Sequence, residues 1–66
     1  MTIVKVIEVI SEGSTVDEAI KAAVQEASKT VENICQVNIE HLEALVDKNK
    51  ITKFRANCKV SFIVVH

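Results

Sequence analysis

The sequence feature that most constrains the fold is an amphipathic helix, predicted from Thr15 to Val31. Its apolar residues recur at helical spacing in one narrow stripe made of Val16, Ala19, Ile20, Ala23, Val24, Ala27 and Val31. Thr15 and Glu18 have the spacing of a capping box, in which each side chain binds a free backbone N–H at the helix start. Because the stripe is rich in Ala, the helix suits close packing on a sheet. A single helix, however, covers only one face of that sheet.

The first strand is predicted over residues 3–10, and it is apolar on both faces. Its apolar residues are Val4, Val6 and Ile10 on one face and Ile3, Ile7 and Val9 on the other. A strand with water on one face alternates apolar and polar residues, so both faces of this strand are expected to be covered. The helix covers one face, and we expect a second copy of the chain to cover the other. The residues predicted at this oligomer interface are Ile3, Lys5, Ile7 and Val9.

A second, long strand is predicted from Cys35 to Val46, with one irregularity near its middle. Its apolar residues have one parity up to position 39 and the other parity from position 42. These residues are Cys35, Val37, Ile39, Leu42, Ala44 and Val46. A β-bulge at Glu40-His41 adds one residue and keeps all six on the side of the sheet that faces the helix.

The third strand, predicted from Lys53 to Phe62, alternates cleanly and pairs with the second strand. Its apolar face carries Phe54, Ala56, Cys58, Val60 and Phe62. A turn over residues 47–50 joins the two strands, and Asn49 tolerates the left-handed backbone of such turns. The predicted antiparallel register pairs Ala44 with Phe54, Leu42 with Ala56, Ile39 with Cys58 and Val37 with Val60.

Together these elements predict an α+β fold of β-α-β-β order in a single domain over residues 1–66. A three-stranded antiparallel sheet is expected to wrap round one helix. A chain of 66 residues is near the lower size limit for a self-sufficient core, and 48% of its residues are hydrophobic. We therefore expect a homo-oligomer that covers the remaining apolar surface.

Charge and composition argue against nucleic-acid and membrane partners. The formal net charge is −1 and the chain lacks Trp and Tyr, so neither a phosphate-binding patch nor a base-stacking platform is expected. No apolar run is long enough to span a bilayer, and the N-terminus does not have the pattern of a signal peptide. These features predict a cytoplasmic protein in which Cys35 and Cys58 are free and buried in the core.

The sequence contains no nucleophile–base arrangement and no phosphate-binding glycine loop, so an enzyme is not predicted. His41 and Glu43 share a strand face beside Glu40, and they are candidate metal ligands, with a solvated or interface face as the alternative. The polar face of the hairpin further carries Gln36, Asn38, Lys53, Arg55, Asn57 and Lys59. This face is either a hydrated sheet surface or a subunit interface with a ligand cleft.

Two stretches carry a resemblance to a known family. The first is Lys5-Val6-Ile7-Glu8-Val9-Ile10, followed by a short polar loop and an Ala-rich helix. The second runs from Ile51 to Phe62 and closes with Lys59-Val60-Ser61-Phe62. The chain resembles dodecins over nearly its whole length. This resemblance implies a hollow homo-dodecamer of β-α-β-β protomers that binds or stores a small ligand or ion without catalysis.

Dodecins of the flavin-binding kind hold pairs of flavins, such as riboflavin or FMN, at their subunit interfaces. This chain has Gln36 where these members have a stacking Trp, and Arg55 where they have a Gln that bonds the flavin ring. It also has Glu43-Ala44 in place of Arg-Gly. Loss of the aromatic surface predicts weak flavin binding or none.

The predicted ligand residues in this interface cleft are Gln36, Asn38, Glu43, Arg55 and Asn57. The chain is more similar to the dodecins that lack the Trp, for which calcium binding has been suggested. Three functions stay open alongside binding of another small ligand: a flavin site with an atypical pocket, a calcium site, and a purely structural oligomer.

Overall fold

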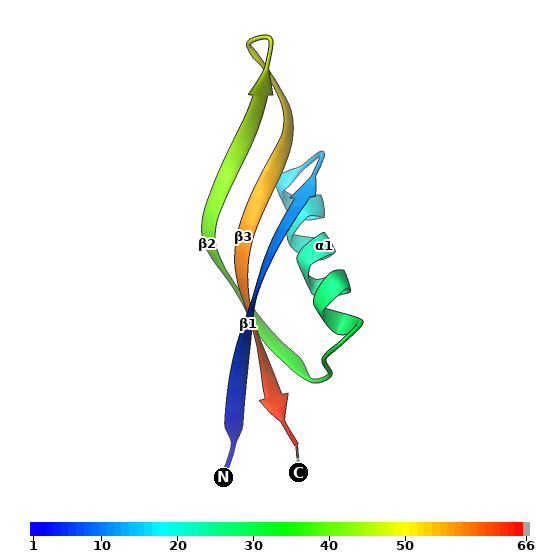
Figure 1. The fold of residues 1–66 in the computed structure, drawn as a ribbon, viewed down its shortest axis with the longest axis vertical. Helices are drawn as coiled ribbons and strands as arrows, with labels where there is room; N and C mark the ends of the chain where they lie inside the picture. Colours follow the sequence, from blue (N-terminus) through cyan, green and yellow to red (C-terminus); the bar gives the residue numbers. More distant parts are fainter. Residues whose placement is uncertain (66) are drawn as a thin grey trace.

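The computed structural model describes residues 1–65 and contains one helix and one sheet (Figure 1). The elements in chain order are β1 (Ile3–Gly13), α1 (Val16–Ser28), β2 (Ile34–Asp47) and β3 (Lys50–Val64). The three strands form one antiparallel sheet in the order β1-β3-β2, and α1 packs on one of its faces. The predicted α+β fold of β-α-β-β order is confirmed.

The start of α1 is fixed by Thr15, as the sequence predicts. The Thr15 Oγ1 accepts a hydrogen bond from the backbone N–H of Glu18 at 3.1 Å. The second half of the predicted capping box is wrong, because the Glu18 carboxylate accepts from the backbone N–H of Ser14, at 3.1 Å, and from the Ser14 hydroxyl. The helix ends at Ser28, before the predicted Val31, and the chain then turns through Asn33 at a φ of 62°.

The core lies between α1 and the two strands β1 and β3. Its buried residues are small: Ala19, Ala23 and Ala27 on the helix, and Ala56, Cys58 and Val60 on β3. Small side chains bring the helix axis close to the sheet. The chain also passes close to α1 at Gly13, where an added Cβ would lie 2.6 Å from the backbone N of Ala19. Next to it, the Ser11 hydroxyl donates to the Ala19 carbonyl at 2.5 Å.

The β2–β3 hairpin has the predicted register. All four predicted pairs are present, from Ala44 with Phe54 to Val37 with Val60. The predicted bulge is also confirmed, because the register shifts between Ile39 and His41. Lys48 and Asn49 form the turn with φ values of 51° and 65°, which is the left-handed geometry that two-residue hairpin turns favour.

One prediction about the hairpin is wrong: of the apolar residues of β2, Val37 packs on the core, but the helix does not cover most of the others. Because β3 is the central strand, α1 lies over β1 and β3, and most of β2 is outside its reach (Figure 1). A helix with its side chains is about 10 Å across and strands are about 4.8 Å apart, so one helix covers about two strands. Large apolar side chains on the helix side of the hairpin are therefore exposed by 42 to 62%, and we call this set the uncovered hairpin face: Ile39, Leu42, Val46 and Ile51.

The prediction that both cysteines are buried is correct only for Cys58. Cys58 is fully buried, whereas Cys35 is exposed. The reason is a register shift between Ile34 and Gln36, which moves Cys35 off the core face and leaves its Sγ 3.5 Å from the Ser61 carbonyl oxygen.

β1 is longer than predicted, and α1 covers only one of its two faces. Ile7 and Val9 are half-buried on the α1 side, where Val9 packs on the core. The prediction that these two residues lie on the face left open by the helix, at the oligomer interface, is therefore wrong. The face that one chain leaves open carries Val4, Val6 and Ile10, which are 52, 52 and 63% exposed; we call it the uncovered strand face. Contact of Ile3 and Lys5, exposed near the start of β1, with another subunit stays a prediction.

Candidate ligand-binding face

The predicted ligand residues all belong to the sheet face opposite α1, which we call the outer face. Alternate residues of β3 from Ala56 to Val60 are buried under the helix, so the residues between them point to the other side. Strand pairing arranges this face in cross-strand rows. From the hairpin end, the rows are Glu12–Arg55–Glu43, Ile10–Asn57–His41, Glu8–Lys59–Asn38 and Val6–Ser61–Gln36. The structure thus brings the five predicted residues together on neighbouring rows.

The first charge cluster of the outer face is centred on Glu12. Its Oε2 accepts hydrogen bonds from Arg55 Nε at 3.0 Å and Arg55 Nη2 at 2.8 Å. Its Oε1 lies 2.7 Å from the Lys53 ammonium. The hydrogen bonds from Lys53 and Arg55 hold the pKa of Glu12 below its ordinary value. One carboxylate thus binds two cations at the junction of β1 and the hairpin.

Glu12, the centre of this cluster, is the outer-face residue that the sequence analysis missed. It follows the predicted end of the first strand at Ile10, in a stretch that was predicted as a loop. In the structure β1 continues to Gly13, because this glycine admits the helix start so closely and Ser11 bonds to α1. The detectable signal is parity: a strand that continues past Ile10 places Glu12 on the same face as Glu8 and Ile10.

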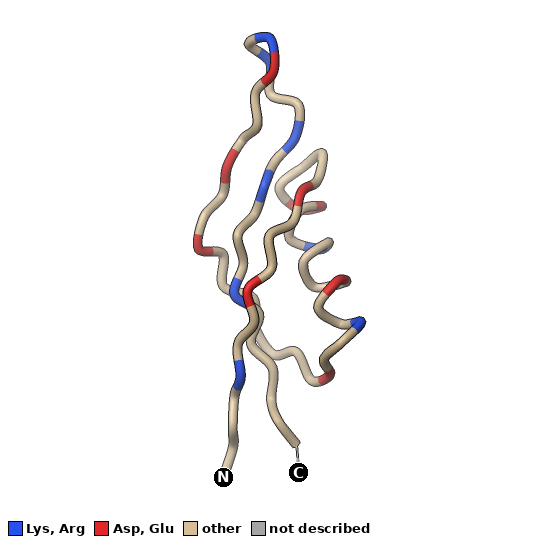
Figure 2. The backbone as a smooth tube through the Cα atoms, viewed as in Figure 1, with Lys and Arg blue, Asp and Glu red and all other residues tan. Residues whose placement is uncertain are grey.

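A second charge cluster occupies the middle of the outer face. Glu40 Oε1 lies 3.2 Å from Lys59 Nζ and accepts from Asn38 Nδ2 at 3.3 Å. A shallow, polar cavity of about 280 Å³ adjoins these groups, and it is lined by Glu8, Glu40, His41, Asn57 and Lys59. Figure 2 shows the basic positions of β3 running beside acidic positions of β1, so opposite charges face each other along the sheet.

The candidate metal ligands His41 and Glu43 lie on the outer face, but in different rows. Glu43 is opposite Arg55 and His41 is opposite Asn57. Within residues 1–65, no three His, Cys, Asp or Glu side chains come close enough to hold a metal ion. The neighbouring Glu40 is already paired with Lys59. Side-chain ligands from a single protomer therefore do not assemble a metal centre in the described part of the chain.

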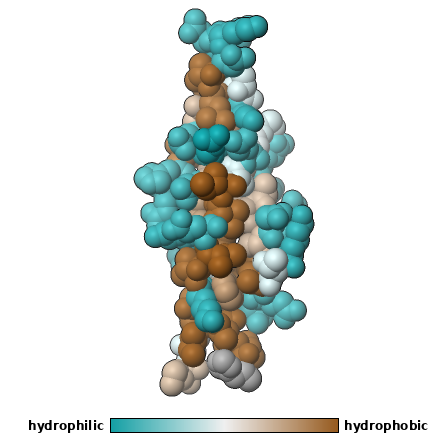
Figure 3. Space-filling view, in the orientation of Figure 1, coloured by the Kyte–Doolittle hydropathy of each residue, from teal (hydrophilic) through white to brown (hydrophobic). Residues whose placement is uncertain are grey.

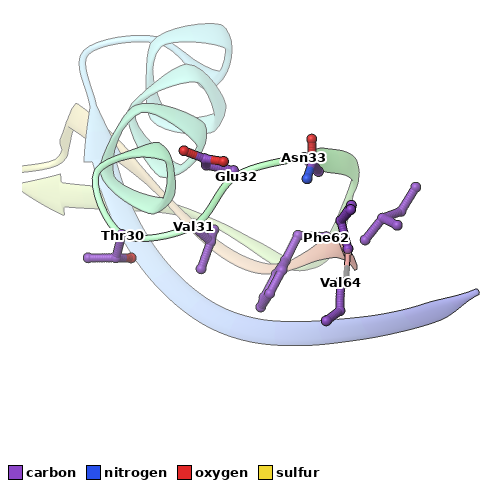
Figure 4. Close-up of a pocket in the computed structure, with 8 residues that line it drawn as sticks. Thr30, Val31, Glu32, Asn33, Phe62 and Val64 are labelled. Carbon is purple, nitrogen blue, oxygen red and sulfur yellow. The ribbon is translucent and has the colours of Figure 1, made fainter.

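A second cavity, of about 340 Å³, lies between the segment that follows α1 and the end of β3 (Figure 4). This end of the molecule is opposite the hairpin turn (Figure 1). The cavity is lined by Thr30, Val31, Glu32, Asn33, Phe62, Ile63, Val64 and Val65. Asn33 closes this region through its carbonyl, which accepts from the Ile63 N–H at 3.0 Å. The sequence analysis predicted no site here, and the cavity contains none of the predicted ligand residues.

The two thiols differ in their surroundings, since Cys35 is exposed and Cys58 is buried. Burial raises the pKa of Cys58, so this thiol is protonated and behaves as a small apolar core group.

No helix of the described chain combines the length and apolar character needed to cross a bilayer.

The chain is a small α+β protomer, with one short helix on a curved three-stranded sheet. Its outer face is polar in part, and its two uncovered apolar faces are of the kind that other subunits cover. The sequence model of the Dodecin family matches residues 3–65, and the chain belongs to this family. Dodecins are known as small, non-enzymatic flavin-binding proteins, and a dodecamer is typical of them.

Solved structures support the same fold. A dodecin from Streptomyces davaonensis superposes with a TM-score of 0.89 at 20% identity, covering 98% of this chain and 97% of that one. A Thermus thermophilus protein gives a TM-score of 0.92 at 16% identity, over 100% of this chain and 98% of that one. Dodecin from Streptomyces coelicolor gives 0.89 at 20% identity, over 98 and 94%. No individual curated protein gives a significant match.

Proposed function

We propose that this protein is a non-enzymatic binding or storage protein of dodecin type, which holds a small ligand or ion on its outer face within a homo-dodecamer. The observation that carries the proposal is the composition of this face. Polar rows that include Asn38, Arg55 and Asn57 adjoin the uncovered strand face, which is apolar and belongs to the same side of the sheet. Apolar cover beside convergent polar groups is typical of ligand sites at subunit interfaces.

Within this function we propose that riboflavin and FMN bind weakly or not at all. Gln36 is exposed and offers no planar aromatic surface for stacking. Arg55, which replaces the residue that bonds the ring in flavin-binding dodecins, already donates two hydrogen bonds to Glu12. A flavin would have to compete with that carboxylate for the guanidinium.

The experiment is a fluorescence titration of riboflavin with the natural chain and with the double variant Gln36→Trp, Arg55→Gln. We expect measurable quenching only with the double variant, because it supplies both the stacking ring and the amide. The variant Gln36→Leu, Arg55→Gln is the matched control, since it is apolar at position 36 without a ring. Tight, stoichiometric quenching by the natural chain would show that the reading of Gln36 is wrong.

A cation is the second candidate ligand, and the shallow cavity on the outer face supports it. Glu8 and Glu40 both line this cavity, beside His41. Carboxylates from neighbouring subunits could complete the oxygen ligands that calcium requires. The test is calorimetric titration of metal-free protein with calcium chloride. Saturable binding that Glu40→Gln abolishes would support calcium as the ligand. Absence of binding would contradict a calcium site and leave an organic molecule as the candidate ligand.

A further inference from the structure

We propose that Glu12 determines the charge specificity of the outer face: by binding Arg55 and Lys53 together, it prevents this face from taking anionic ligands. This inference rests on the proposed function, because it concerns the same face. It also changes the expectation for Arg55, whose guanidinium would otherwise be a natural partner for a phosphate or carboxylate.

The Glu12 carboxylate occupies the position that an external anion would take between Arg55 and Lys53. Both oxygens of Glu12 are engaged, Oε2 by two guanidinium N–H groups at 2.8 and 3.0 Å and Oε1 by the Lys53 ammonium at 2.7 Å. An incoming anion needs the same donors in the same directions. It would therefore have to displace a carboxylate that is tethered to β1 and thus present at very high effective concentration.

The balance of charge supports the same conclusion. Across the row, Arg55 lies between Glu12 on β1 and Glu43 on β2, so one cation has a carboxylate on each side. Lys53 adds the second positive charge, which makes this group neutral overall. Removal of Glu12 alone leaves a net positive charge on neighbouring positions of β3, while the polar rows beside it are unchanged.

The side chains of this group are also accessible enough to bind a ligand. The exposed fractions are 35% for Glu12, 40% for Arg55 and 49% for Lys53. Neither cation is buried in the protomer core, so replacing the carboxylate by an amide of the same shape exposes charge without opening a cavity. The natural outer face therefore disfavours anionic ligands.

The test is a calorimetric titration of the assembled protein with inorganic phosphate at low ionic strength. We expect Glu12→Gln to bind phosphate at least about tenfold more tightly than the natural chain, because Arg55 and Lys53 regain free donors. Adding Arg55→Gln to Glu12→Gln should remove this gain. The matched control is Glu8→Gln, which makes the same charge change on the same strand and face, but Glu8 does not pair with Arg55 or Lys53.

Three results would overturn the inference. They are equal phosphate affinity of the natural chain and Glu12→Gln, an equal gain in Glu8→Gln, and no saturable binding to Glu12→Gln. The phosphate readout is independent of the flavin and calcium titrations. A chain that binds neither flavin nor calcium but passes the phosphate test would leave Glu12 as the determinant of charge while contradicting the proposed ligands.

Discussion

The helix-covered part of the sheet and the β2–β3 hairpin have the same apolar alternation, but one chain buries the apolar side chains of the first part fully and those of the hairpin only in part. Under α1, Ala56, Cys58 and Val60 of β3 are fully buried within one chain. Along the hairpin, Leu42 and Val46 continue the same pattern on β2, yet 48 and 62% of their surfaces are exposed. The difference teaches that the alternation specifies which side of a strand is to be covered, but not which chain covers it.

The space-filling view shows that one chain leaves much apolar surface open (Figure 3). Hydrophobic side chains extend along much of the length of the face shown in Figure 3, while the hydrophilic ones gather at its sides and at the hairpin turn. The molecule measures 51 × 19 × 13 Å, so it is too thin for one chain to enclose this surface. Apolar exposure of this extent is typical of association surfaces.

The largest expected effect comes from a charge on the uncovered hairpin face. Leu42→Asp should weaken assembly by several kcal/mol, because an unpaired carboxylate buried at an interface costs that much. The helix-covered part should stay folded, since Leu42 is outside it. The measurements are light scattering for mass and circular dichroism for helix content. Asn49→Asp, in the exposed turn, is the control, and unchanged mass in Leu42→Asp would contradict the assignment of this face to an interface.

The converse change is made inside the helix-covered part. Ala23→Leu should destabilise the protein by roughly 1–3 kcal/mol, because a larger side chain at a fully buried position forces α1 away from the sheet. Urea unfolding at fixed protein concentration measures this loss. Gln25→Leu, on the exposed side of the same helix, should be close to neutral. Similar stability of both variants would show that the close helix–sheet contact is not required.

Glu12 connects the two parts, so the pH dependence of its contacts tests their coupling. Its lowered pKa means that the charged form stabilises the fold at pH values above its ordinary value of 4.5. This contribution is lost as the pH falls through the lowered folded-state pKa. Denaturant midpoints of the natural chain and Glu12→Gln should therefore differ at neutral pH and converge below pH 4.5. A difference that does not change with pH would contradict the coupling through charge.

The smallest expected effect is in the hairpin turn, far from the helix. Lys48 has a φ of 51°, a conformation that Asn adopts at lower cost than Lys. Lys48→Asn should raise stability by about 0.5 kcal/mol, and a thermal melt measures it. Lys50→Asn is the control, because Lys50 begins β3 without a positive φ. Equal shifts in both variants would assign the gain to charge and not to backbone geometry.

The sequence was sufficient to predict features encoded by local chemistry. Thr15 caps the helix through its hydroxyl, the bulge follows from a change of parity after Ile39, and the register follows from matching apolar positions. Each of these depends on residues close in sequence or directly opposite in a hairpin. The shared face of Gln36, Asn38, Arg55 and Asn57 follows from the same register, and their binding of a ligand stays a prediction.

Other features depend on tertiary arrangement and were missed. Nothing in the alternation indicates that β3 is the central strand, so the exposure of Leu42 was not predicted. The exposure of Cys35 depends on a register shift without a clear sequence signal. Glu12 was missed because the continuation of β1 depends on how closely Gly13 approaches α1.

The most direct test of the account is the mass of the natural protein in solution, since both uncovered faces are explained by other copies of the chain. Size-exclusion chromatography with light scattering at micromolar concentration should give about 88 kDa, twelve times the 7.3 kDa of one chain. A stable, folded monomer at that concentration, with Leu42 and Val6 in water, would contradict the account.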